Sequence, residues 1–175
     1  HWRYSNCSIW WELGDLMSTL KVDSIQNTAG VDNQGKIIQV VNSTAAVARH
    51  QSTSTVFIDT GFSVTITPKF ANSKILLNLN ATVYSTNNYV YVDFYKNGVS
   101  LTGSATNGDG LCGPTCISLA YWCSLATFYE DSPNTTSAVT YNLYGRTNSG
   151  TLYVGAFTSA VYPSAVYLSA TEIAQ

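Results

Sequence analysis

Apolar and polar residues alternate along most of the chain beyond residue 36. In the run KILLNLNATVY, apolar side chains occupy every second position from Ile75 to Val83, and Asn78, Asn80 and Thr82 lie between them. A period of two is that of a β-strand with one buried and one wet face. Similar runs are IIQVVN, TVFI, FSVTIT, SAVTYNLYGR, GTLYVGAF and SAVYLSATEI. The pattern predicts a strand-rich fold.

Three further segments refine this prediction. YVYVDFYKNG ends in Asn97-Gly98, a dipeptide that favours a tight hairpin turn, so a strand should lead into it. The long run CISLAYWCSLATFYE has apolar residues on both faces, so we expect a strand that is covered on both sides. NSTAAVARHQ is short and flanked by polar residues, and we expect a loop with a helical turn there.

Gly, Asn, Ser, Asp and Pro separate these runs, and no internal repeat of fixed period is visible. Residues 36–175 are therefore predicted to form an all-β, antiparallel jelly-roll β-sandwich of about nine strands. An extended N-terminal segment, residues 17–35, precedes it. Its apolar residues Leu20, Val22 and Ile25 are too few to form a core, so a partner surface should cover them.

Residues 1–16 contain three of the four tryptophans and differ in character from the rest. Two interpretations stay open. The segment is either an N-terminal anchor whose tryptophans insert into a neighbouring protein, or a leader translated from upstream of the true start at Met17. We favour Met17, because Leu-Gly-Asp-Leu-Met is compatible with a ribosome-binding site in the coding DNA.

Composition narrows the function. Charged residues make up 10% of the chain, the net charge is −2, and the Lys and Arg residues are scattered singly. Such a chain lacks the basic patch that nucleic-acid binding requires, so no nucleic-acid partner is expected. No apolar run is long enough for a membrane-spanning helix, so no membrane insertion is expected.

Candidate chemistry is sparse, and we predict no catalytic residues, no metal ligands and no cofactor. His50 lacks a marked nucleophile, even with Asp59 nearby in sequence. Glu130 and Asp131 are adjacent carboxylates in an expected surface turn, which does not place them across a substrate. Cys112 is separated from the next cysteine by one residue more than a usual zinc or redox pair. The disulfide state stays open for Cys112, Cys116 and Cys123.

The order MSTLKVDSIQNTAG, GKIIQVV, FSVTITPKFANSKILLNLNATV, FYKNG and LSATEIAQ resembles small fibre or appendage proteins of tailed bacteriophages, especially those of marine bacteria and cyanobacteria. The resemblance covers residues 17–175. It implies a non-enzymatic virion structural protein on the particle surface. Its N-terminal segment would dock on other phage structural proteins through Leu20, Val22 and Ile25, and its head would serve adhesion or host recognition.

TP, SKILL, YKNG and the final strand also resemble the trimeric jelly roll of tumour-necrosis-factor-type heads, which implies a homotrimer. Host-surface glycans or proteins are the ligands that the phage resemblance implies. The alternative is a glycan-binding or glycan-hydrolysing tailspike-type protein. The numerous tyrosines suit either a subunit interface or ordinary cross-strand packing.

Overall fold

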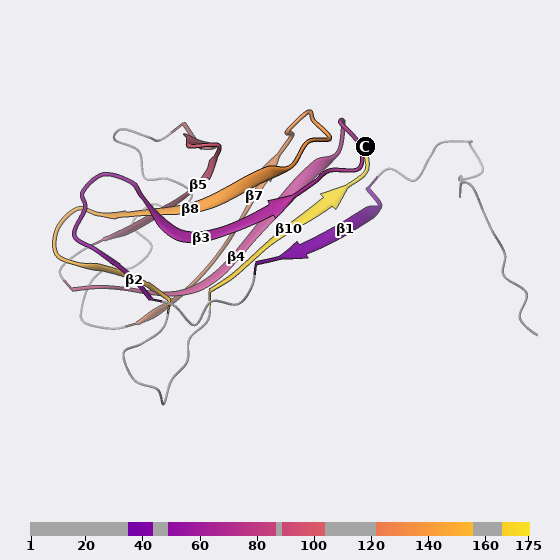
Figure 1. The fold of residues 1–175 in the computed structure, drawn as a ribbon. Helices are drawn as coiled ribbons and strands as arrows, with labels where there is room; N and C mark the ends of the chain where they lie inside the picture. The colour runs from indigo at the N-terminus through magenta and orange to yellow at the C-terminus, as the bar shows by residue number, and fades with distance from the viewer. Residues whose placement is uncertain (1–34, 44–48, 87–88, 104–121, 156–165) are drawn as a thin grey trace, which may run out of the picture. The chain divides into compact units, whose positions relative to one another are not determined.

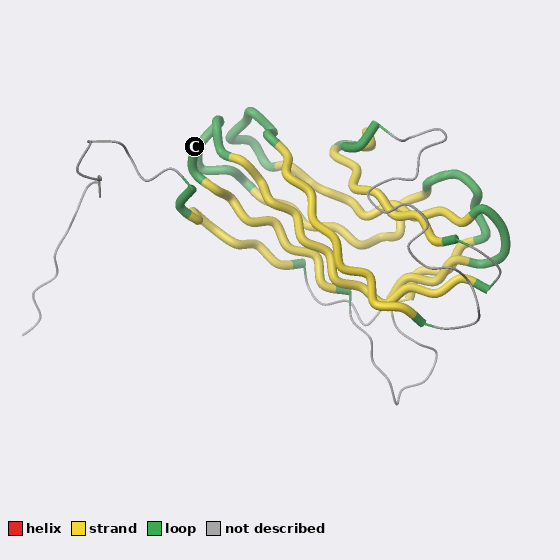
Figure 2. Tube along the Cα trace, turned by 180° about the vertical axis from the view of Figure 1, so that it is seen from behind, coloured by secondary structure: helices red, strands yellow, loops and turns green. Residues whose placement is uncertain are grey.

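A computed structural model describes residues 35–43, 49–86, 89–103, 122–155 and 166–175. These residues form β-strands and connecting turns, and none of them is helical (Figure 2). The strands, most of which are labelled in Figure 1, are β1 (Ile37–Asn42), β2 (Arg49–Ser52), β3 (Ile58–Ile66), β4 (Lys74–Ser85), β5 (Val90–Lys96), β6 (Val99–Ser100), β7 (Cys123–Asp131), β8 (Val139–Thr147), β9 (Leu152–Gly155) and β10 (Tyr167–Ile173).

The strands pair in a nested order. β1 pairs with β10, β2 with β9, β3 with β8, β4 with β7 and β5 with β6, and every pairing is antiparallel. The chain is thus a long antiparallel ribbon that turns back at the β5–β6 hairpin and is wound into two sheets, which is the connectivity of a jelly roll. The predicted fold class, an antiparallel jelly-roll β-sandwich, is confirmed.

The two sheets form the layers of the sandwich (Figures 1 and 2). The larger sheet has the order β1-β10-β4-β9-β2, and the smaller has the order β3-β8-β5-β6. β4 organises the larger sheet, because β7 pairs along one of its edges while β10 and then β9 pair along the other. Across most of its width this sheet therefore runs β1, β10, β4, β7.

The core lies between the sheets and follows the predicted alternation. In β4 the odd-numbered residues from Ile75 to Val83 are buried, and in β8 the buried residues include Tyr141 and Leu143. Val92 and Phe94 of β5 pack into the same cluster. Burial of these apolar side chains is the main favourable contribution to folding.

The predicted hairpin is confirmed, since Asn97 and Gly98 have φ angles of 52° and 80° between β5 and β6. The predicted strand at TVFI begins only at Ile58, because the Ser54 hydroxyl accepts from the backbone N–H of Val56 and donates to its carbonyl, which bends the chain. The loop expected around His50 is wrong for Arg49–Ser52, which pair with the distant strand β9. With β2 and the short β6, the described residues contain ten strands, which agrees with the predicted number of about nine.

Glu172 joins the end of β10 to the β3–β4 connection. Its side chain is fully buried. One carboxylate oxygen accepts from Ser73 Oγ at 2.8 Å and from the backbone N–H groups of Lys69 and Phe70 at 2.7 and 3.2 Å. The other accepts from Gln39 Nε2 of β1 at 2.6 Å. Glu172 thus connects β1, β10 and the β3–β4 connection through four hydrogen bonds.

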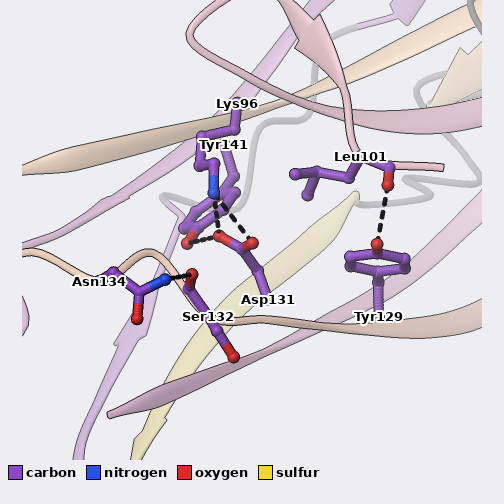
Figure 3. A network of polar contacts seen from close by, with 7 residues as sticks. All are labelled: Lys96, Leu101, Tyr129, Asp131, Ser132, Asn134 and Tyr141. Atoms are coloured by element: carbon purple, nitrogen blue, oxygen red, sulfur yellow. Dashed lines mark hydrogen bonds and ion pairs between the residues drawn. The ribbon is translucent and has the colours of Figure 1, made fainter. Parts of the chain in front are cut away.

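Asp131 connects the two sheets at the end of β7 (Figure 3). Its carboxylate accepts from Lys96 Nζ at 2.8 and 2.9 Å and from the Tyr141 hydroxyl at 2.8 Å. Lys96 and Tyr141 belong to β5 and β8 of the smaller sheet. Nearby, the Tyr129 hydroxyl donates to the carbonyl of Leu101 at 2.8 Å. These contacts fix one end of the sandwich.

Candidate functional site

The predicted docking residues Leu20, Val22 and Ile25 lie outside the described residues, as does all of residues 1–16. Their role stays a prediction. Cys112 and Cys116 also lie outside, and Cys123 is a half-buried free thiol.

His50 and Asp59 do not form a hydrogen-bonded dyad. The Asp59 carboxylate accepts from the backbone N–H of Gly61 at 2.7 Å and from Asn142 Nδ2 at 3.0 Å. His50 Nε2 is buried without a hydrogen-bond partner, and burial lowers the pKa of His50 although the negative charge of Asp59 opposes this. The arrangement favours a neutral structural imidazole.

Glu130 and Asp131 lie at the end of β7 rather than in a surface turn, so they point to opposite faces of the sheet. Glu130 is exposed and forms an ion pair with Lys74, whereas Asp131 is directed into the sandwich toward Lys96. The two carboxylates therefore do not face one another. Within the described ranges, no three His, Cys, Asp or Glu side chains gather as metal ligands. The same ranges contain no helix able to cross a membrane.

The outer face of the larger sheet is the most unusual surface of the described chain. Strand register places Phe128 beside Asn78, and Asn78 beside Ser169. One row further along, Ala126 lies beside Asn80 and Asn80 beside Tyr167. We call this surface the neutral face. Its side chains come from four adjacent strands: Val40 and Asn42 of β1; Tyr167, Ser169 and Thr171 of β10; Leu76, Asn78, Asn80, Thr82 and Tyr84 of β4; and Ser124, Ala126 and Phe128 of β7.

Charge is confined to the two ends of the neutral face. The Lys74–Glu130 ion pair lies at one end. At the other end, the Arg49 guanidinium lies 5.0 Å from the ring centre of Tyr153. The Tyr153 ring contacts the Tyr84 ring, which in turn stacks on Trp122. Between these ends the face consists of amides, hydroxyls and apolar groups.

Large apolar groups project from this face. Phe128 is 71% exposed, Tyr167 is 59% exposed and Val40 is 53% exposed. Polar residues lie between these three groups in the strand register. Together with the small side chains around them they form a broad, weakly polar surface, and large surfaces of this kind mark interaction sites. The sequence predicted that β7 would be covered on both sides, and this is wrong for the face that carries Ser124, Ala126 and Phe128.

A groove of about 440 Å³ crosses the centre of the neutral face. Phe128 and Tyr167 stand on opposite sides of it, and Asn78 and Asn80 lie between them. The remaining lining residues are Leu79, Ala126, Thr127 and Ser169. The amide side chains of Asn78 and Asn80 form no hydrogen bond within the described part of the chain, so their donors and acceptors are available to a partner.

The outer face of the smaller sheet is different, because aromatic rings cover it. Tyr95 stacks on Tyr144 with ring centres 3.8 Å apart. The Arg146 guanidinium lies 3.9 Å from the ring centre of Tyr91 and 5.3 Å from that of Phe57. Tyr91 and Tyr95 are buried by these contacts, although the alternation of residues along β5 places them on the outer face of the sheet. Here the tyrosines serve cross-strand packing.

Asp93 is fully buried within this cluster. One carboxylate oxygen accepts from Ser100 Oγ at 2.6 Å and Thr102 Oγ1 at 2.9 Å, while the other has no partner. Burial raises the pKa of Asp93, although hydrogen bonds from Ser100, Thr102 and the backbone of Phe94 oppose the rise. A raised folded-state pKa stabilises the protein below the unfolded pKa, and this contribution is lost as the pH rises through the folded pKa.

Replacing Asp93 by asparagine should therefore change the free energy of unfolding, relative to the wild type, more favourably at pH 7 than at pH 4. Urea unfolding of both chains should show the stability difference moving in favour of Asp93→Asn as the pH rises. Ser100→Ala removes a hydrogen-bond donor to the charged carboxylate of Asp93. The free energy of unfolding of this variant should therefore fall more steeply with rising pH than that of the wild type. A pH-independent difference for Asp93→Asn would contradict the assignment.

Comparisons with known proteins give only distant structural similarity. No family model matches the sequence, and no curated protein matches it. A structure of the infectious bursal disease virus Gt strain is 14% identical with a TM-score of 0.42, and the aligned part covers 93% of this chain and 44% of that one. For the infectious bursal disease virus VP2 subviral particle, the identity is 13%, the TM-score 0.42, and the coverage 93% and 43%. The chain thus spans less than half the length of these structures.

Proposed function

We propose that the protein is a non-enzymatic structural protein of a phage particle, a fibre or appendage whose jelly-roll head self-associates as a homotrimer through the neutral face. Its work is binding: the N-terminal segment docks on the particle, and the head is displayed for adhesion or host recognition. The observation that carries this proposal is the neutral face, which is broad, uncharged over most of its length and set with exposed apolar groups.

The size of the face supports self-association. Four strands spaced by about 4.8 Å span roughly 19 Å, and a strand of nine residues such as β7 is roughly 30 Å long. The projected area is therefore roughly 600 Å², and side-chain relief increases the accessible area beyond this. A stable interface buries about 800 Å² on each partner. The face is thus of the right order for a lasting contact.

The charge distribution supports the same partner. Two identical faces repel one another when they carry a net charge, whereas this one holds an ion pair at one end and a single arginine at the other. Amide side chains can both donate and accept, so Asn78 and Asn80 can bond to donors or acceptors of a second copy. A surface of this composition is compatible with a second copy of itself.

The virion assignment is supported by the ordered resemblance of residues 17–175 to phage appendage proteins. Washed particles of the phage that encodes the protein should contain it in multiples of three, at one fixed position that gold-labelled antibody locates by electron microscopy. Labelling of capsomers would indicate a head fibre, and labelling of the tail would favour host recognition. Absence from washed particles would overturn the assignment.

A further inference from the structure

We propose that, in the homotrimer, the Phe128 side chain of each copy inserts into the groove of the next copy, between Tyr167 and the amides of Asn78 and Asn80. This inference deepens the proposed function and rests on it. Each copy then gives one ring and accepts one ring across its neutral face.

The position of Phe128 requires an explanation. It lies in the middle of a regular nine-residue strand and is 71% exposed. Its neighbour along the same face, Ala126, is too small to shield it. An aromatic ring fixed on a rigid strand loses little conformational entropy when it is buried by a partner, which is why such rings dominate interface energetics.

The groove has the size and chemistry to accept that ring. Its volume of about 440 Å³ exceeds that of one benzyl side chain, and Tyr167 supplies an aromatic wall. Ala126 and Ser169 keep the approach open because their side chains are short. The amides of Asn78 and Asn80 have free hydrogen-bonding groups at the base, which can satisfy polar groups that the contact brings together.

A second copy is favoured over a small ligand because of the width of the exposed apolar surface. Phe128 lies on β7 and Val40 on β1, at opposite edges of the four-strand face. A short glycan in the groove would leave Val40 exposed, whereas another sheet covers both edges. Phe128 lies on β7, which pairs only with β4 among the described strands, and the groove extends from β7 over β4 to Tyr167 of β10. A copy can therefore insert its Phe128 ring at the β7 side of its face into one neighbour while its own groove receives the ring of another. Contacts that join different features head to tail close into rings, and a trimer is such a ring.

Site-specific photocrosslinking tests the insertion. Phe128 is replaced by p-benzoylphenylalanine in the full chain, mixed with isotope-labelled wild type, irradiated and digested for mass spectrometry. Crosslinks between labelled and unlabelled chains are expected at residues 78–80 and 167–169. The control carries the same group at Val99, which is also exposed but lies on β6 of the other sheet, and it should give none of these crosslinks.

A second variant keeps the test decisive. Phe128→Ser should weaken self-association at least tenfold in sedimentation equilibrium while leaving the urea stability of the dissociated monomer unchanged, whereas Val99→Ser should leave both unchanged. A trimer whose crosslinks fall elsewhere would overturn the insertion and leave the proposed function intact. A monomer in solution and on particles would overturn both. A monomer whose groove resonances shift with maltohexaose would show that a glycan is the occupant instead.

Discussion

Replacing Glu172 by glutamine is expected to lower the free energy of unfolding by about 2 to 3 kcal/mol, since hydrogen bonds to a buried charged group contribute about 1.5 to 3 kcal/mol. A glutamine has an amide NH2 group in place of one carboxylate oxygen. That group would face a side chain or backbone N–H that now donates a hydrogen bond to Glu172, and the hydrogen bond would be lost. Gln39 cannot simply turn its own amide, because its Nε2 also donates to the Thr67 carbonyl at 2.8 Å. Urea unfolding at pH 7 measures the loss.

The effect of Glu172 should depend on pH. Burial alone would raise its pKa, but hydrogen bonds from Gln39, Ser73 and two backbone N–H groups outweigh burial and lower the pKa from its ordinary value of 4.5. A lowered folded-state pKa gives stability that is present above the unfolded pKa and is lost as the pH falls through the folded pKa. The gap between wild type and Glu172→Gln should therefore narrow below about pH 4.5.

Glu130→Gln is the matched control for this prediction. Glu130 is an exposed glutamate whose ion pair with Lys74 lies at the surface, and such pairs contribute about 0 to 1 kcal/mol. Its replacement should change stability far less than that of Glu172. Equal losses for the two variants would show that Glu172 does not secure the β3–β4 connection.

Replacing Asp131 by alanine is expected to cost about 2 to 3 kcal/mol. The change leaves the Lys96 ammonium without its ion pair and the fully buried Tyr141 hydroxyl without its acceptor. Breaking a buried ion pair costs about 3 to 5 kcal/mol, and the partial exposure of Lys96 places the expected loss at or below the lower end. Burial, together with the hydrogen bond to Asp131 and its negative charge, raises the pKa of Tyr141.

A double-mutant cycle tests this network. Tyr141→Phe alone should cost about 1 kcal/mol, the net worth of one hydrogen bond. The double variant Tyr141→Phe, Asp131→Ala should cost less than the sum of the two single changes. The reason is that Tyr141→Phe removes the hydroxyl that Asp131→Ala leaves without an acceptor. Glu130→Ala, one residue away on the opposite face, is the control and should have little effect. Strict additivity would mean that Tyr141 and Asp131 do not stabilise each other.

Much of the fold was predictable because local alternation reports which face of a strand is buried. The odd-numbered residues of β4 and the turn at Asn97-Gly98 follow from sequence alone. The strand β2 does not, because RHQS has no alternation of apolar residues and extends only by pairing with β9, about a hundred positions later.

The neutral face could not be predicted in the same way. Whether Phe128 is covered depends on which strands lie beside β7 and on what lies above the sheet, and neither is written in the local pattern. Glu172 was missed because glutamate is almost never fully buried unless it is paired. Its partners Ser73 and Gln39 lie 99 and 133 positions away in sequence. Only the folded sheet order brings these residues together.

Native mass spectrometry of the wild type, Ala126→Lys and Thr65→Lys tests whether the neutral face joins the copies of a homotrimer. Ala126 lies in the middle of the neutral face, and Thr65 is exposed on the outer side of β3 in the other sheet. A lysine at 126 would bury an unpaired charge in the contact between copies, while a lysine at 65 would stay in solvent. We expect a three-chain mass for the wild type and Thr65→Lys and a one-chain mass for Ala126→Lys. A three-chain mass for Ala126→Lys would contradict this expectation.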